Sequence, residues 1–117
     1  MDIYTYLNKV LNDKSITEHT GDKKVFYNKT KNPTGIYCTY FILKEKPSYI
    51  DEGQEKETEY LIQIDIFANQ NYTNLLKAIK KQLKTNGFYK DEIVDIEDDF
   101  YTYHKVLRYY KYMKNED

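Results

Sequence analysis

The spacing of apolar residues predicts a helix at the start of the chain and a short strand after it. Four apolar residues recur at helical spacing: Ile3, Leu7, Val10 and Leu11. Asp2 can cap this helix, which should end near residues 12–14. A polar loop over residues 15–22 then leads to a strand at residues 24–27.

Two further stretches have the composition and alternation of strands. Residues 36–44 follow an Asn-Pro-Thr-Gly turn and carry apolar or aromatic groups on both faces, as a strand covered on two sides does. In residues 60–68 every second side chain should face the core: Tyr60, Ile62, Ile64 and Ile66. The other face of this strand mixes polar and apolar groups, as a partly covered surface does.

A long acidic connection, residues 45–58, separates these two strands and contains Pro47 and Gly53. Its length predicts an extended hairpin loop that becomes ordered only against a partner.

The second half of the chain contains the clearest helix, residues 72–86. Apolar residues form one stripe along it, and lysines occupy the opposite side. Asn71 or Thr73 can cap its start, and Gly87 can end it in the left-handed conformation. Phe88 is placed to fold back onto the last turn. Residues 92–96 and 105–113 are rich in β-branched and aromatic residues and predict a closing hairpin, with a frayed tail at residues 114–117.

These elements predict one α+β domain over residues 1–117, with the order α-β-β-β-α-β-β. We expect a mostly antiparallel sheet of four to five strands flanked by two helices. The size is common for one domain, and 40% hydrophobic with 32% charged residues is typical of soluble proteins. The longest apolar runs are too short to span a membrane, and we expect no signal peptide. The single cysteine, Cys38, excludes an internal disulfide and fits a reducing cytoplasm.

Tyrosine is unusually frequent, with 14 tyrosines against 5 phenylalanines and no tryptophan. A tyrosine packs its ring while its hydroxyl stays in water, which suits a contact surface. Tyrosine can equally replace phenylalanine in a core, and both interpretations remain open.

Charge is segregated along the chain although the net charge is only −1. Residues 45–59 carry six acids and two lysines, residues 77–90 five lysines and no acid, and residues 91–99 six acids and no base. Segregated charge of both signs suits a molecule that packs beside copies of itself, and a solvated surface would also account for it. The candidate residues for contact with another subunit or a partner are Tyr49, Asp51, Glu52, Glu55, Lys77, Lys80, Lys81 and Lys84.

No pattern of catalytic, cofactor-binding or metal-binding residues is evident. Cys38 lies within a strand, far in sequence from His19 and His104, which favours a buried hydrophobic role over a nucleophilic one. The acidic run 97–99 lacks the alternating oxygen ligands and glycine of a calcium loop, and four scattered glycines form no phosphate-binding loop. We therefore expect no enzyme, no cofactor and no metal.

Several phrases, in their order, resemble the tail-completion proteins of tailed bacteriophages, also called tail terminators or head–tail joining proteins. The phrases are Tyr-Leu-Ile-Gln-Ile-Asp-Ile at residues 60–66, Asn-Gly-Phe at the end of the lysine-bearing helix, Asp98-Asp99, and His-Lys-Val-Leu-Arg-Tyr at residues 104–109. The first helix and the strand near residues 25–27 fit the same plan, so the resemblance covers nearly the whole chain. The chain departs from it in its higher content of tyrosine and lysine.

The resemblance implies a structural virion protein that assembles as a homo-oligomeric ring, usually a hexamer, on the end of the tail tube protein. The ring ends tube polymerisation and offers a surface to the head-completion or connector protein at the head–tail junction. DNA would pass through its lumen without specific binding, and the candidate lumen-facing acids are Glu97, Asp98 and Asp99. The protein would be made in the bacterial host cytoplasm, with no cofactor and no membrane contact.

A small nucleic-acid-binding or regulatory module of a phage or other mobile element is the alternative. Lysines on one helix face could meet phosphates, and strand aromatics could stack on bases. The slightly acidic net charge argues against it, because a dedicated binder usually has a clear basic excess.

Overall fold

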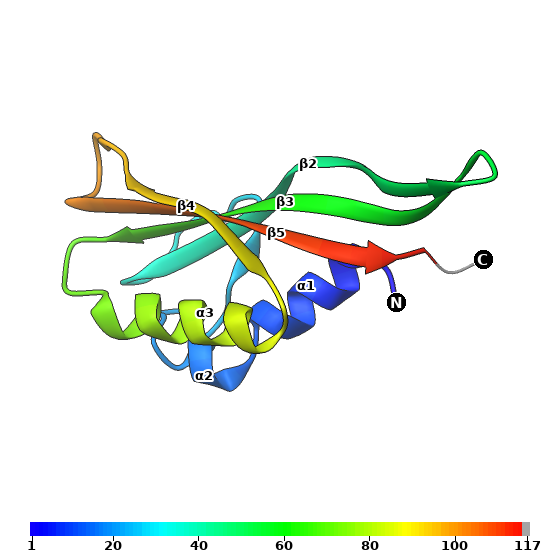
Figure 1. The fold of residues 1–117 in the computed structure, drawn as a ribbon. Helices are drawn as coiled ribbons and strands as arrows, with labels where there is room; N and C mark the ends of the chain where they lie inside the picture. Colours follow the sequence, from blue (N-terminus) through cyan, green and yellow to red (C-terminus); the bar gives the residue numbers. More distant parts are fainter. Residues whose placement is uncertain (116–117) are drawn as a thin grey trace.

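Figure 1 shows the arrangement of helices and strands in the computed structural model, which describes residues 1–115. The helices are α1 (Ile3–Leu11), α2 (Lys14–Thr17) and α3 (Thr73–Thr85). The strands are β1 (Phe26–Tyr27), β2 (Tyr37–Asp51), β3 (Gln54–Ala68), β4 (Tyr89–Asp95) and β5 (Tyr103–Lys114). The strands form one sheet in the order β1-β2-β3-β5-β4, and the helices lie against one of its faces. Among the described strands only the β1–β2 pair is parallel, so the predicted α+β fold with a mostly antiparallel sheet is confirmed.

The hydrophobic core lies between the helices and the central strand β3. Ile62, Ile64 and Ile66 are fully buried, and they alternate along β3 as the sequence predicts. The facing side chains come from helices and are buried as well: Leu7, Leu11, Leu75, Ile79 and Leu83. Because the apolar stripes of α1, α3 and β3 pack against one another in this layer, the layer fixes the position of both helices against the sheet.

Local signals in the sequence set the ends of the two long helices. The Asp2 carboxylate accepts a hydrogen bond from the Thr5 N–H at 2.9 Å, which caps α1. At the start of α3, the Asn71 side chain accepts from the Thr73 N–H at 2.8 Å. Gly87 ends α3 with a φ of 77°, and the N–H of buried Phe88 donates to Leu83 O at 2.9 Å. The predicted ends at Asp2 and Gly87 are confirmed. The N-cap residue of α3 is Tyr72, which makes no side-chain cap bond, so Asn71 acts from one position before the cap.

A short helix was not expected between residues 15 and 22. α2 starts behind Asp13, whose carboxylate accepts from the Ser15 N–H at 3.0 Å, and it buries Ile16. The prediction of a purely polar loop was therefore wrong at its start. Four residues carry too little periodicity to distinguish one buried isoleucine from a loop.

The predicted loop over residues 45–58 is also wrong, because β2 and β3 continue through it and pair up to Asp51 and Gln54. The two strands meet in a tight turn at Glu52 and Gly53, whose φ values are 52° and 74°. Positive φ at both central residues is the geometry that favours glycine in two-residue hairpins. Pro47 is tolerated because β2 has a neighbouring strand on only one side at that point.

The end of the chain agrees with the predicted hairpin, since β4 and β5 pair antiparallel. Within the predicted frayed tail, Lys114 still belongs to β5 and the Asn115 N–H donates to Lys56 O at 2.9 Å, while residues 116–117 lie outside the described part. Within residues 1–115, no helix has the length and apolarity needed to cross a membrane.

Candidate functional site

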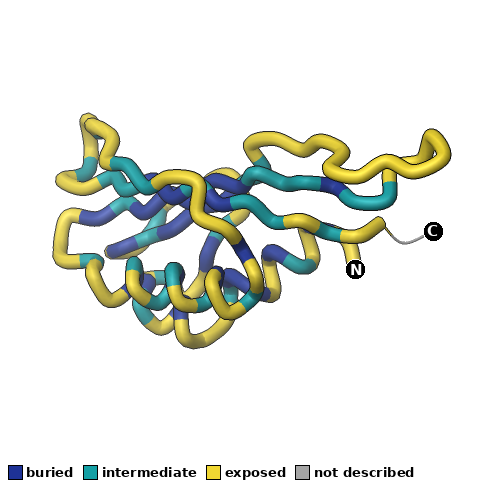
Figure 2. The backbone as a smooth tube through the Cα atoms, in the orientation of Figure 1, coloured by how far each residue is buried: buried dark blue, intermediate teal, exposed yellow. Residues whose placement is uncertain are grey.

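The outer halves of β2 and β3 project beyond the helices as a ribbon, which we call the arm (residues 44–60) (Figure 1). The strand β2 bends at its base, where the register shifts between Ile42 and Lys44. Most of the arm is exposed to solvent (Figure 2). It makes the molecule elongated, with principal dimensions of 51 × 27 × 25 Å.

A polar cluster at the end of β5 holds the arm in shape. The Asn115 side chain donates to the Glu55 carbonyl at 2.9 Å and to its carboxylate at 3.1 Å. The Thr58 hydroxyl, 2% exposed as a residue, donates to the Glu55 carboxylate at 2.6 Å and lies 3.0 Å from Asn115 Oδ1. Hydrogen bonds from Thr58 and Asn115 lower the pKa of Glu55. We call these three residues the clasp, and they order the arm without a partner.

The tip of the arm places two apolar side chains next to two carboxylates. Tyr49 and Ile50 are 56% and 58% exposed, and the neighbouring residues Asp51 and Glu52 are exposed as well. Within the described residues, neither acid has an ion-pair partner. The predicted contact residues Tyr49, Asp51 and Glu52 thus lie together at the tip. The fourth, Glu55, bonds to Thr58 and Asn115 in the clasp.

The four candidate lysines of α3 lie within an arc of about 100° around the helix. Lys77, Lys81 and Lys84 are exposed and Lys80 is half-buried, and none of them has an ion pair in the part of the chain that the structure describes. They lie opposite the buried stripe, as predicted.

Two of these lysines border a groove between α3 and β4. The groove has a volume of about 530 Å³, and it is lined by Lys80, Lys84, Gly87, Phe88, Tyr89, Lys90 and Tyr109. Lys77 and Lys81 do not line it. Sequence reasoning missed Lys90 and the rings as parts of this surface, because they come from β4, from the connection before it and from β5.

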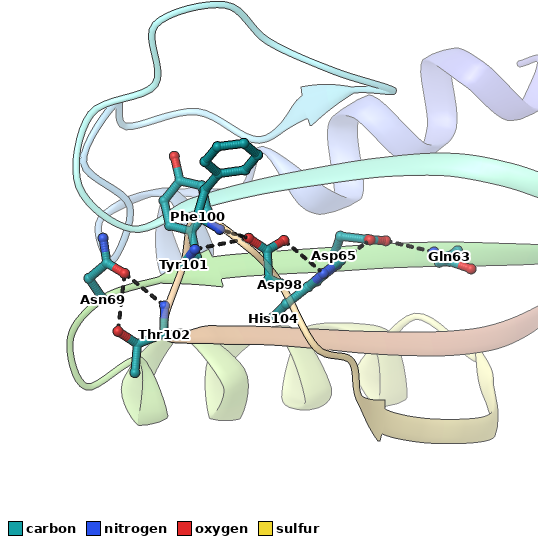
Figure 3. Close-up of polar contacts among 8 residues, drawn as sticks. All are labelled: Gln63, Asp65, Asn69, Asp98, Phe100, Tyr101, Thr102 and His104. Atoms are coloured by element: carbon teal, nitrogen blue, oxygen red, sulfur yellow. Dashed lines mark hydrogen bonds and ion pairs between the residues drawn. The ribbon is translucent and has the colours of Figure 1, made fainter.

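The acidic loop after β4 contains one acid that faces inward. Asp98 accepts hydrogen bonds from the N–H groups of Phe100 and Tyr101 at 2.8 and 2.9 Å, and its carboxylate lies 3.4 Å from His104 Nδ1 (Figure 3). The bond from the Phe100 N–H is the main cause of its lowered pKa. Asp98 therefore fixes the loop, and Glu97 and Asp99 remain the exposed acids of the predicted set.

His104 lies between two carboxylates on the sheet face opposite the helices. Its Nε2 is 2.7 Å from Asp65 Oδ2, and Gln63 donates to the other Asp65 oxygen at 2.9 Å (Figure 3). Asp65 and Gln63 are buried, and the His104 ring packs on Phe67 with centroids 4.2 Å apart. The arrangement satisfies the buried Asp65 carboxylate, whereas His104 Nδ1 is buried without a hydrogen-bond partner among the described residues.

Cys38 does not meet a histidine. It pairs with Ile66 in the sheet and faces the helices, whereas Phe67 and His104 pair on the other face. Complete burial raises the pKa of the Cys38 thiol, so it acts as a small apolar side chain. Among the described residues, no group of three or more histidine, cysteine or acidic side chains is arranged to hold a metal ion.

Tyrosines serve both of the roles left open by the sequence. Tyr40 and Tyr109 are buried in the core, and burial raises the pKa of each phenol. Others are largely exposed: Tyr4, Tyr27, Tyr49, Tyr89, Tyr103 and Tyr112.

Comparison with known protein families yields no matching family model. A search of curated proteins yields no match either.

Proposed function

We propose that this protein is a structural virion protein that caps the end of a phage tail tube as a ring. The ring ends polymerisation of the tube protein and forms the interface to the head-completion or connector protein. The observation that carries the proposal is the presence of two complementary surfaces on one protomer, the acidic arm and the lysine-bearing groove. Surfaces of this kind join copies head to tail, and such contacts close into a ring when the rotation between copies permits it. The order of sequence phrases that resembles tail terminators supports the same function, with six copies.

The exposed acids of the loop after β4 suit the lumen of this ring. Glu97 and Asp99 would repel the phosphates of passing DNA, so that DNA slides without binding. Asp98 contributes indirectly, because it orders the loop that carries them.

The role we propose is structural and not catalytic. The Cys38 thiol is buried, and the His104 ring nitrogens both face carboxylates. These are the side chains that would otherwise be the first candidates for nucleophile and base.

Electron microscopy of phage particles tests the proposal. In the phage that encodes this protein, a nonsense mutation in its gene should give tails of uncontrolled length or tails that are not joined to heads. A wild-type copy supplied in trans should restore normal particles, and the protein should be present in purified virions. Joined tails of normal length in the mutant would overturn the proposal. If instead the purified protein binds DNA at micromolar concentration with steep salt dependence, the nucleic-acid-binding alternative is favoured.

A further inference from the structure

We propose that the tip of the arm of one copy binds in the lysine-lined groove between α3 and β4 of the next copy. The inference deepens the ring assembly of the proposed function and rests on it, and it names the two surfaces that meet. The occupant of the groove is thus a second copy of this chain.

The tip has the chemistry of an inserted segment. Tyr49 and Ile50 are exposed together, although large apolar side chains are usually covered when they occur side by side on an ordered element. Asp51 and Glu52 follow directly and have no ion pair within residues 1–115. Because the clasp already orders the arm, binding would cost little conformational entropy.

The groove has the matching chemistry. Lys80, Lys84 and Lys90 line it together with three aromatic residues, of which Tyr89 is 62% exposed and Phe88 and Tyr109 are largely buried. Its volume of about 530 Å³ lies within the range of clefts that bind compact ligands. The carboxylates of the tip can meet the ammonium groups while its two apolar side chains cover the exposed ring of Tyr89.

Lys111 lies beside this groove but is already engaged. Its Nζ donates to Asn86 O at 2.7 Å and lies above the rings of Tyr6 and Phe88 at 5.4 and 5.3 Å. The lysines that line the groove have no comparable partner, so they are the cations available to an incoming carboxylate.

The arm cannot reach the groove of its own chain. Its tip points away from α3 in Figure 1, and the clasp holds its strands to the end of β5. The other prominent apolar side chain, Phe100 with 86% exposure, follows the acids Asp98 and Asp99, so its loop does not complement an acidic tip. A different surface on each partner makes the contact heterologous, which is the type that builds rings.

Charge reversal on each surface tests the contact. The arm variant Asp51→Lys with Glu52→Lys and the groove variant Lys80→Glu with Lys84→Glu should each weaken self-association by about 100-fold, because like charges then face each other. An equimolar mixture of the two variants should associate again as alternating copies, since each reversed surface meets a reversed partner. A Lys77→Glu, Lys81→Glu variant is the matched control, with the same charge change on the same helix outside the groove, and should associate as the wild type does. Sedimentation velocity at low salt measures the self-association of the arm variant, the groove variant, their mixture and the control variant, each against the wild type.

A cross-link gives a second measurement that does not depend on charge. Copies carrying Ile50→Cys mixed with copies carrying Lys84→Cys should form a disulfide-linked dimer under mild oxidation, and wild-type protein should not, because its Cys38 is buried. All substituted positions are exposed or half-buried, and circular dichroism verifies that each variant is folded.

Two results would overturn the inference. The first is a wild type that stays monomeric at millimolar concentration together with cysteine variants that form no disulfide-linked dimer. The second is a mixture of the charge variants that does not regain association. The outcomes also separate it from the proposed function. Tail defects in the nonsense mutant combined with unaffected assembly of the charge variants would reject the contact alone. Restored association in the mixture combined with normal tails in the nonsense mutant would reject the tail function alone.

Discussion

Removing the Asn115 side chain should loosen the arm while the rest of the sheet stays intact. In Asn115→Ala the arm loses the bond from Nδ2 to the Glu55 carbonyl and the contact of Oδ1 with the buried Thr58 hydroxyl. Hydrogen bonds of this kind contribute about 0.5–1.5 kcal/mol each, and Asn115 is exposed, so we expect a loss of about 1 kcal/mol for opening the arm. The bond to the Glu55 carboxylate adds little because water screens it.

Hydrogen exchange measures this loss directly. A change of about 1 kcal/mol corresponds to about fivefold faster exchange of the arm amides, residues 44–60, when opening is local. Amides paired between Ile62–Ile66 and β5 should exchange at the wild-type rate, because those strands do not depend on the clasp. Gln54→Ala is the matched control, since Gln54 lies in the same arm and, within residues 1–115, its side chain bonds only with the Lys56 side chain. Equal arm exchange in Asn115→Ala and wild type would refute the role of the clasp, as would equal acceleration across the whole sheet.

Three further predictions follow from single positions. Asp98→Asn should lower the melting temperature at neutral pH, because folding lowers the pKa of Asp98 and its carboxylate therefore stabilises the folded state. This stabilisation is fully present above the unfolded pKa of about 3.9 and is lost as the pH falls through the folded pKa. A difference from wild type that stays constant down to strongly acidic pH would contradict this. Gly21→Ala should lower the free energy of unfolding by about 3 kcal/mol in a denaturant titration, because the new Cβ would lie 1.9 Å from Thr34 O and the backbone would have to move. A variant as stable as the wild type would contradict this expectation. Cys38 should react with a thiol reagent only after denaturation, because burial raises its thiol pKa, and rapid labelling of the folded protein would disprove this.

The body of the fold could be predicted because its periodic patterns are long. Ile62, Ile64 and Ile66 alternate along the buried half of β3, and Leu75, Ile79 and Leu83 recur over more than two turns of α3. The arm could not be predicted, because it is held by pairing with β5 and by a hydrogen bond between residues 60 positions apart, Asn115 and Glu55. The local sequence of residues 45–58, with its acidic residues and one proline, therefore predicts a loop.

The candidate surfaces were predictable in charge but not in shape. Counting charges along the chain finds the acidic tip and the lysines of α3. It cannot distinguish Lys80 from Lys81, because only the packing of β4 beside α3 decides which lysine lines the groove. It also cannot show that Asp98 turns toward His104, since the position of His104 depends on Asp65 from another strand, 39 residues away in the sequence.

In the described part of the chain, the outer edge of β2 in the arm has no paired strand, next to exposed Tyr49 and Ile50. An open, flat edge of this kind can template a strand of another chain and grow into fibrous aggregates. Here Pro47 removes one backbone donor, and register shifts on either side of Tyr49 twist the edge out of line. The acidic side chains add mutual repulsion between arms. The ribbon is therefore guarded against indiscriminate backbone pairing, so that recognition is left to side chains.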